Sequence, residues 1–234
     1  MLLDVPVLSV REAATVAGEV SRLRGRWIQR SEGFATVGVA AYLDIMHSRD
    51  PEATYYGRIP ACNAMLQSSF GDLLERVREA LAATLGRPAR FEPSVALPGF
   101  HFFEDCGICT TDRPSQHFDL QHRSMRWPFG PVTDEVISFT LALQLPAQGG
   151  GLDVWDLVED DLARLARLGR NPKMDQLGRV KPFKRHPYTP GTMAVQLRPL
   201  MHRIAAVPER LPGDRRITLQ GHGVRDGDAW VLYW

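Results

Sequence analysis

A histidine and a carboxylate stand two positions apart near the middle of the chain, as His117 and Asp119 in the segment Ser-Gln-His-Phe-Asp-Leu-Gln-His that covers residues 115–122. In an extended strand, residues two apart project to the same face, so this imidazole and this carboxylate can converge on one point. Both groups are common metal ligands. The pair therefore supplies half of a candidate metal site, and a third ligand must come from elsewhere.

His202 is the best candidate for the third ligand, because it follows one strand-like run and precedes another. Four other histidines are weaker candidates. His47 lies in a helix-like stretch and His101 in an apolar run. His186 stands beside a proline, and His122 is too near the pair to close the site. Two histidines and one carboxylate on one face of an iron ion leave three coordination positions open, as in non-haem iron(II) sites that hold a cosubstrate and O2.

Arg216 and Thr218 form a second pair on one face of a strand, fourteen residues after His202. An arginine fork binds a carboxylate through two parallel hydrogen bonds, and a threonine hydroxyl adds a donor. Arg215 is the competing candidate, but in that strand phase the arginine would have no hydroxyl neighbour. We therefore expect Arg216 and Thr218 to point inward, and Ile217 and Leu219 to pack outward beneath covering helices.

This ordered set resembles the Fe(II)/2-oxoglutarate-dependent dioxygenase superfamily, whose pattern is H-x-D/E, a distal histidine and R-x-S/T. The resemblance extends over residues 91–234 and includes the apolar run 136–145, the glycine turn near 149–151 and the turn and strand at 190–195. It implies a double-stranded β-helix, a cupin-like jelly-roll barrel with the metal at its open mouth. It also implies that His117, Asp119 and His202 bind iron and that Arg216 and Thr218 bind the far carboxylate of 2-oxoglutarate.

The same resemblance implies a reaction that uses Fe(II), O2 and 2-oxoglutarate, which is decarboxylated to succinate while a substrate C–H bond is hydroxylated. Related halogenases carry Gly or Ala in place of Asp119, so hydroxylation is expected, and desaturation or ring formation stays open. The nucleic-acid demethylase branch carries a second arginine six residues after the first, where this chain has His222. With 28 basic and 27 acidic residues as well, no nucleic-acid partner is expected.

Hydrophobic periodicity predicts helices before residue 90 and short strands after it. A capping box at Ser9 and Glu12 starts a helix over residues 10–29, and a second helix over 66–85 ends at Gly86. The predicted strands cover residues 91–97, 100–104, 136–145, 152–156, 192–197, 202–207, 216–224 and 229–233. We expect one mainly β domain over 1–234, with a largely helical part at 1–89 and a jelly-roll core at 90–234.

An insertion at residues 157–188 lacks strand character and is interpreted either as a lid over the mouth or as a solvated excursion. The mouth is expected to include residues 105–114 and 122–129, which carry Arg113, Arg123, Arg126 and Trp127. Such a mouth suits a carboxylate-bearing small molecule, and an amino acid or amino-acid-derived metabolite is the favoured substrate. The alternatives are a peptide or protein side chain, or a non-catalytic or hydrolytic cupin-like metal-binding protein. His122 and His222 are left as residues that support ligands, contact substrate or lie at the surface.

The chain has three cysteines, too few for a disulfide framework, and Cys106 and Cys109 lack the further ligands of a zinc site. Its first ten residues carry no basic region or cleavage site, and no apolar run is long enough to span a membrane. These features predict a cytoplasmic protein without a membrane partner.

Overall fold

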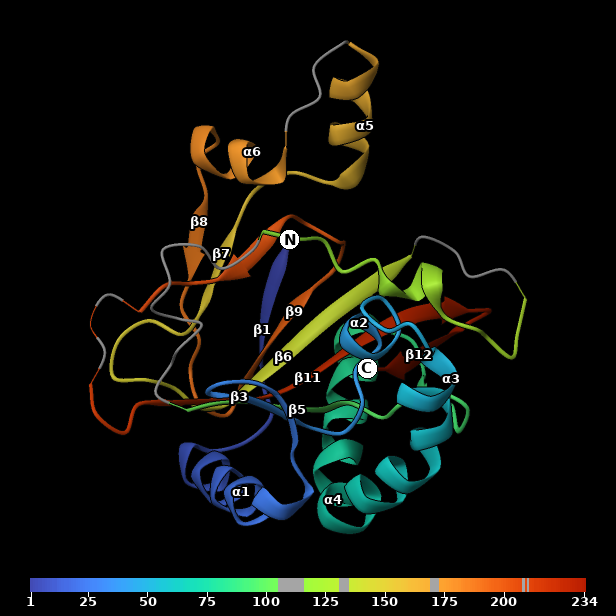
Figure 1. Cartoon of the computed structure of the whole chain (residues 1–234), viewed down its shortest axis with the longest axis vertical. Helices are drawn as coiled ribbons and strands as arrows, with labels where there is room; N and C mark the ends of the chain where they lie inside the picture. The colour runs from blue at the N-terminus through green and yellow to red at the C-terminus, as the bar shows by residue number, and fades with distance from the viewer. Residues whose placement is uncertain (105–115, 131–134, 169–172, 208, 210) are drawn as a thin grey trace.

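A computed structural model of the chain describes residues 1–104, 116–130, 135–168, 173–207, 209 and 211–234. Its larger sheet is antiparallel apart from one short pairing, and β11 lies at its centre (Figure 1). The strands run in the order β1 (Leu2–Pro6), β9 (Thr192–Gln196), β6 (Val136–Gln144), β11 (Arg215–Asp226), β5 (Gly99–Glu104), β3 (Phe34–Val37) and β2 (Ile28–Ser31). Strand β12 (Ala229–Tyr233) also pairs with β11, and β4 (Ala89–Phe91) runs parallel to β12.

A smaller antiparallel sheet consists of β10 (His202–Ile204), β7 (Leu152–Val154) and β8 (Lys184–His186). An isolated bridge between His117 and His202 extends its β10 edge. Side chains from both sheets line one cavity, which therefore lies between them. This two-sheet antiparallel arrangement is the one expected of a jelly roll.

Helices α1 (Val10–Arg22) and α4 (Ile59–Leu85) lie together on the outer side of the larger sheet (Figure 1). Ile217 and Leu219 of β11 belong to the same buried core as Val20 of α1 and Leu74 of α4. The outward face of β11 is therefore apolar and covered, as the sequence predicted. Its inward face is left for the cavity.

The first helix begins at the predicted capping box, but its predicted end at residue 29 was wrong. Helix α1 stops at Arg22, a short 3-10 helix covers Arg24–Arg26, and β2 follows. The indole N–H of Trp27 donates to the carbonyl of Val20 and turns the chain back on the helix. Pairing of β2 with β3 then overrides the helical pattern of the sequence.

Helix α4 ends before Gly86, which has a φ of 65°, as predicted. It starts at Ile59, earlier than the predicted residue 66, and is interrupted at Phe70. Two more short helices, α2 (Ala41–Asp44) and α3 (Pro51–Thr54), lie between β3 and α4. Residues 1–89 are thus largely helical, but they also supply three strands of the larger sheet.

The predicted strand at 91–97 was also wrong, because only β4 (Ala89–Phe91) pairs there. The Asn63 side chain donates to the carbonyl of Val95 and accepts from the N–H of Leu97. These two bonds give the Val95 carbonyl and the Leu97 N–H hydrogen-bond partners without a neighbouring strand.

The insertion at 157–188 contains a strand that the sequence did not reveal, since β8 pairs with β7. Its helices α5 (Glu159–Arg167) and α6 (Met174–Val180) lie beyond the end of the molecule opposite α1 and α4 (Figure 1). Leu177 of α6 packs against Trp155 and Met201, and among the described residues of the insertion Tyr188, at its end, lines the cavity. The described residues of its two helices do not line it, and the choice between a lid and a solvated excursion stays a prediction.

Cys106, Cys109 and Arg113 lie outside the described residues. Within the described ranges, no helix combines the length and the apolar character that crossing a membrane requires.

Candidate metal centre

His117 and His202 are brought together by their own backbones. Each N–H donates to the carbonyl of the other at 3.0 Å, and the two imidazole centroids lie 4.4 Å apart. Directly opposed residues of an antiparallel bridge carry their side chains on the same face. Residues 85 positions apart in the chain thus form one side of a site.

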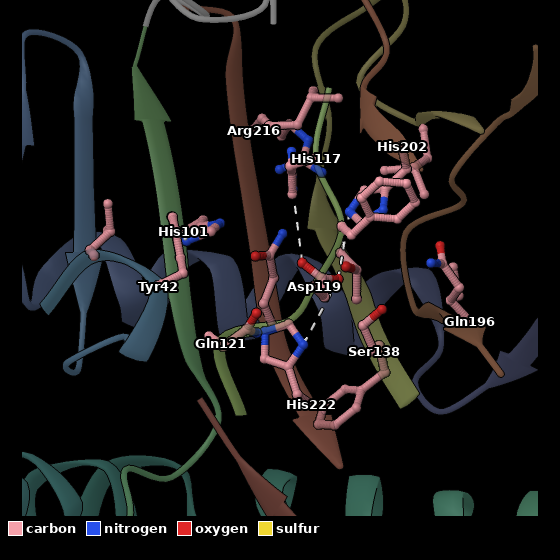
Figure 2. Close-up of a pocket in the computed structure, with 18 of the residues that line it drawn as sticks. Tyr42, His101, His117, Asp119, Gln121, Ser138, Gln196, His202, Arg216 and His222 are labelled. Atoms are coloured by element: carbon pink, nitrogen blue, oxygen red, sulfur yellow. Dashed lines mark hydrogen bonds and ion pairs between the residues drawn. The ribbon is translucent and has the colours of Figure 1, made fainter. Parts of the chain in front are cut away.

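Asp119 completes this cluster (Figure 2). Its Oδ1 lies 3.8 Å from Nε2 of His117, and its Oδ2 lies 3.5 Å from Nε2 of His202. One possible ligand atom from each of the three residues lies within 4.8 Å of the others. A divalent metal with bonds of about 2.1 Å needs neighbouring ligand atoms roughly 3 Å apart, so small side-chain shifts would close the cluster on an ion.

The protonation states suit metal binding. Burial alone would raise the pKa of Asp119, but His202, His222, His117 and a hydrogen bond from Ser138 together hold that pKa well below its usual range. Burial lowers the pKa of His202 despite the nearby carboxylate, so its imidazole is neutral. At neutral pH, Asp119 is therefore a carboxylate and His202 a neutral imidazole.

The orientation of His202 is fixed by its other ring nitrogen. Nδ1 lies 2.8 Å from the carbonyl oxygen of Leu200, which can only accept, so Nδ1 carries the proton. Nε2 then presents a lone pair toward the Asp119 carboxylate, which is itself an acceptor. Two acceptors facing each other at 3.5 Å make no hydrogen bond, and a cation between them would satisfy both.

Arg216 supplies the second half of the site from β11. Its side chain is fully buried, Nε donates to the carbonyl of Gly150 at 2.9 Å, and Nη1 reaches the hydroxyl of Thr218 at 3.4 Å. Nη2 has no partner, and in the part of the chain that the structure describes no carboxylate pairs with this guanidinium. A buried charge without a counterion is costly, so the geometry calls for an anion here.

The strand phase of β11 agrees with the sequence prediction. Arg216 lines the cavity, whereas the guanidinium of Arg215 lies over the ring of Phe102, which belongs to the outer core. Thr218 is also fully buried, but it does not itself line the cavity. Its contact in this structure is with Arg216, and direct binding of a ligand by its hydroxyl stays a prediction.

The cavity has a volume of about 530 Å³ and is mostly apolar. Its described walls come from both sheets and from α2, and the apolar part consists of Leu2, Phe34, Leu43, Met46, Phe103, Phe118, Phe139, Leu152, Ala194 and Ile204. His117 is the most exposed of the three candidate ligands, with 46% of its side chain accessible, so the cavity opens at that residue. A pocket of this size suits a small molecule.

The expected arginine-rich mouth was wrong for the residues that the structure describes. Arg123 forms a surface ion pair with Glu159, and Arg126 forms one with Glu52. Neither lines the cavity, and Trp127 packs against Tyr233 instead. Arg216 is the only arginine among the described residues of the lining.

Sequence reasoning missed the contribution of α2 and His101. The hydroxyl of Tyr42 lies 2.8 Å from Nε2 of His101, and both side chains line the cavity (Figure 2). Burial lowers the pKa of His101 well below its usual value, and the positive charges of Arg216 and Arg30 lower it further, so the imidazole is neutral. Alternation along β5 could have placed His101 on the inner face. Helix α2 could not be found in the same way, because four residues are too few to show a helical period.

Ser138 was missed as well, and His222 was left as a residue that supports ligands, contacts substrate or lies at the surface. Both line the cavity, and Nδ1 of His222 lies 3.9 Å from Oδ2 of Asp119. Burial lowers the pKa of His222 to about 4. His222 lies four residues after Thr218, so strand alternation places it on the inward face of β11. Alternation does not reveal that its side chain approaches the Asp119 carboxylate. His122 is buried too, while His47 lines the cavity at its α2 wall.

Comparison with known proteins identifies the fold. No family model and no curated protein matches the chain. Among solved structures, an N-substituted L-amino acid dioxygenase from Burkholderia ambifaria, crystallised with alpha-ketoglutarate, aligns over 100% of this chain and 86% of its own, with a TM-score of 0.64 and 14% identity.

Two further structures support the same conclusion. The alpha-ketoglutarate-dependent epimerase SnoN from nogalamycin biosynthesis aligns over 96% of this chain and 77% of its own, with a TM-score of 0.51 and 14% identity. AviO1 from Streptomyces viridochromogenes aligns over 97% and 90%, with a TM-score of 0.50 and 17% identity. The chain has the fold of the 2-oxoglutarate-dependent dioxygenases, and the predicted double-stranded β-helix is confirmed.

Proposed function

We propose that this protein is an Fe(II)- and 2-oxoglutarate-dependent oxygenase that acts on a small molecule. One observation carries the proposal. A single cavity holds the His117, Asp119 and His202 cluster, whose acceptors face one another, and a buried Arg216 that has no counterion among the described residues. The first group needs a cation and the second needs an anion. Fe(II) and the far carboxylate of 2-oxoglutarate meet both needs.

The residues of the chain have separate tasks in this proposal. When bound, iron with 2-oxoglutarate and O2 supplies the oxidation of a substrate C–H bond. The Leu200 carbonyl holds the His202 proton on Nδ1 and leaves Nε2 free as a ligand, and Asp119 stays ionised. Arg216 binds the carboxylate, and Thr218 steadies the guanidinium. The apolar walls limit water at the reacting carbon.

We further propose hydroxylation of an amino acid or amino-acid-derived metabolite. The largely apolar cavity of about 530 Å³ favours a small molecule over a folded protein partner. The similar structure that acts on N-substituted L-amino acids supports this substrate class. Asp119 supports hydroxylation over halogenation, since it fills a coordination position that halide would otherwise take.

Succinate release tests the proposal. The iron-loaded protein is incubated with 2-oxoglutarate and O2 against a panel of free and N-substituted amino acids, and succinate and hydroxylated product are measured together. We expect at least one compound to stimulate both, and His202→Ala to remove both along with most of the iron.

His186→Ala is the matched control, because His186 also contacts a carboxylate, that of Asp4, but lies outside the cavity. It should keep iron and activity. Full activity with bound iron in His202→Ala would overturn the assignment of the site.

A further inference from the structure

A row of four side chains crosses the larger sheet beneath the candidate metal centre. His222 of β11 lies directly opposite Ser138 of β6 on one side and Tyr233 of β12 on the other. Ser138 in turn lies opposite Gln196 of β9. His222, Ser138 and Gln196 line the cavity, yet none belongs to the cluster of possible metal ligands.

This row reaches Asp119 through Ser138 and His222, and it reaches His202 indirectly through the Leu200 carbonyl. Figure 2 shows the approach of His222 to Asp119. The Ser138 side chain hydrogen-bonds to the Asp119 carboxylate, and Nδ1 of His222 lies 3.9 Å from Oδ2 of the same group. The Gln196 amide donates at 3.2 Å to the Leu200 carbonyl, which also accepts from His202. The row therefore supports both a carboxylate and an imidazole of the site.

Asp119 needs such support because its backbone gives it little. Among the described residues 116–120, only His117 joins a bridge, and Asp119 lies in an irregular stretch before a 3-10 helix at Gln121–Ser124. Its carboxylate orientation is consequently set by side-chain partners. In metal sites, a carboxylate ligand is commonly hydrogen-bonded by neighbouring groups, which fixes its direction.

His222 is held rigidly enough to act as that partner. Its ring packs against Tyr233 with centroids 5.4 Å apart, and it is flanked by two glycines. A Cβ at Gly221 would lie 2.4 Å from the ring of Phe139, and one at Gly223 would lie 2.9 Å from Ile137. The glycines therefore let β11 approach these side chains closely, which fixes where His222 enters the cavity.

The buried Nδ1 of His222 has no hydrogen-bond partner among the described residues. Its nearest charged group is Asp119, which as a carboxylate only accepts, so a proton on Nδ1 is the favourable arrangement. The present separation of 3.9 Å exceeds a hydrogen bond, and a carboxylate movement of about 1 Å would complete one.

We propose that His222 and Ser138 are positioning residues that hold the Asp119 carboxylate for metal binding, and that His222 is not itself a ligand. This inference rests on the proposed function, because it requires a metal at His117, Asp119 and His202. It adds two residues whose effect passes through Asp119 alone.

The test uses Co(II) binding to the metal-free chain of residues 1–234, which needs no turnover. Affinity and the visible absorption spectrum of the bound ion are measured for His222→Leu, His222→Asn and Ser138→Ala. We expect His222→Leu to weaken Co(II) binding by roughly 10- to 100-fold and to change the spectrum. His222→Asn should restore most of both, because its amide nitrogen can occupy the place of Nδ1.

His186→Leu is the matched control, since it removes another histidine–carboxylate contact away from the cavity and should leave Co(II) affinity unchanged. If His222→Leu fails to fold, as judged by thermal unfolding of the metal-free protein, Ser138→Ala decides, because it removes one oxygen atom. Loss of affinity in that variant supports the proposal, and unchanged affinity overturns it.

Two results would separate this inference from the proposed function. Unchanged Co(II) binding in His222→Leu, or equal losses in the Leu and Asn variants, would refute the positioning role while His202→Ala still loses the metal. Retention of Co(II) by His202→Ala would instead overturn the ligand set, and the positioning role with it.

Discussion

Arg216 has no anionic partner in the described structure although its side chain is fully buried, so its substitution isolates cosubstrate binding from metal binding. We predict that Arg216→Ala weakens 2-oxoglutarate binding by roughly 2–5 kcal/mol, the usual effect of removing one partner of a buried charge pair. Iron content should not change. Calorimetric titration of 2-oxoglutarate into the iron-loaded protein, under exclusion of O2, measures the effect.

Arg215→Ala is the control for this prediction, because Arg215 lies on the outer face of the same strand. It should leave 2-oxoglutarate affinity unchanged. If Arg215→Ala alone lost 2-oxoglutarate affinity, the residue that binds the carboxylate would be Arg215 and not Arg216.

Asp119 offers a second test at the level of one side chain. Asp119→Gly removes a ligand and a negative charge while leaving both imidazoles in place. We expect weak iron binding to persist, hydroxylation to be lost or greatly reduced, and high chloride to restore part of 2-oxoglutarate decarboxylation. Product and succinate are measured with and without chloride, and hydroxylation at the wild-type rate would show that Asp119 is no ligand.

The residues that sequence reasoning identified are those linked by short spacing. His117 and Asp119 share a strand face by alternation, and so do Arg216 and Thr218. Alternation could place His101 on the inner face, but it could not assign a role to His101 or Ser138, because their roles depend on which residue lies opposite on a neighbouring strand. Ser138 meets His222, and His101 meets Thr218, through registers that no local pattern encodes.

At the scale of elements, α2 contributes to the cavity wall although it has only four residues. A pair of hydrogen bonds from Arg30 to Asp44, at 2.6 and 2.7 Å, ties this short helix to β2. Asp44 also accepts from the N–H of Ala40 at the start of the helix. Both charged side chains are largely buried, with 12% and 5% of their surfaces accessible.

Breaking this pair should therefore be strongly destabilising. We predict that Arg30→Met lowers the free energy of unfolding by roughly 3–5 kcal/mol, because it leaves Asp44 buried and unpaired. Adding Asp44→Asn should recover part of the loss, since Asn removes the charge but keeps an acceptor for Ala40. Urea unfolding of both variants tests this, and a double variant no more stable than Arg30→Met would contradict it.

The insertion shows why element boundaries were harder to predict than element types. Its charged composition and interruptions concealed β8, a strand of three residues that pairs with β7 only in the folded protein. Leu177 of the same insertion packs in the core with Trp155 and Met201. Short strands depend on their neighbours more than on their own sequence.

At the scale of the whole molecule, His101 predicts how stability changes with pH. Its folded pKa lies well below the ordinary value of 6.5, because of burial first and then of the charges on Arg216 and Arg30, with His222 acting in the same direction and Asp119 against it. Below about pH 6.5 the unfolded chain therefore binds a proton at this position that the folded chain excludes.

The free energy of unfolding of the metal-free protein should consequently fall as the pH decreases from about 7 through 6.5 to 5. His101→Gln should show a shallower fall over that range, because the titrating group is gone. Urea unfolding at several pH values measures both slopes. Equal slopes in the two proteins would show that His101 does not contribute to the pH dependence.

The general fold followed from sequence because many short β-like runs with glycine and proline turns have few compact arrangements. The apolar residues Ile217 and Leu219 indicated which face of β11 the helices cover. The substrate did not follow, because the cavity walls come from segments such as α2 whose placement depends on long-range contacts.

The most direct test of the central proposal is equilibrium binding of Fe(II) and 2-oxoglutarate to the wild-type chain and to His202→Ala, with O2 excluded. We predict that the wild-type chain binds one iron and one 2-oxoglutarate, that 2-oxoglutarate affinity increases when iron is present, and that His202→Ala loses most of the iron and this increase. Iron bound equally well by His202→Ala, or 2-oxoglutarate failing to bind the iron-loaded wild-type protein, would contradict the proposed site.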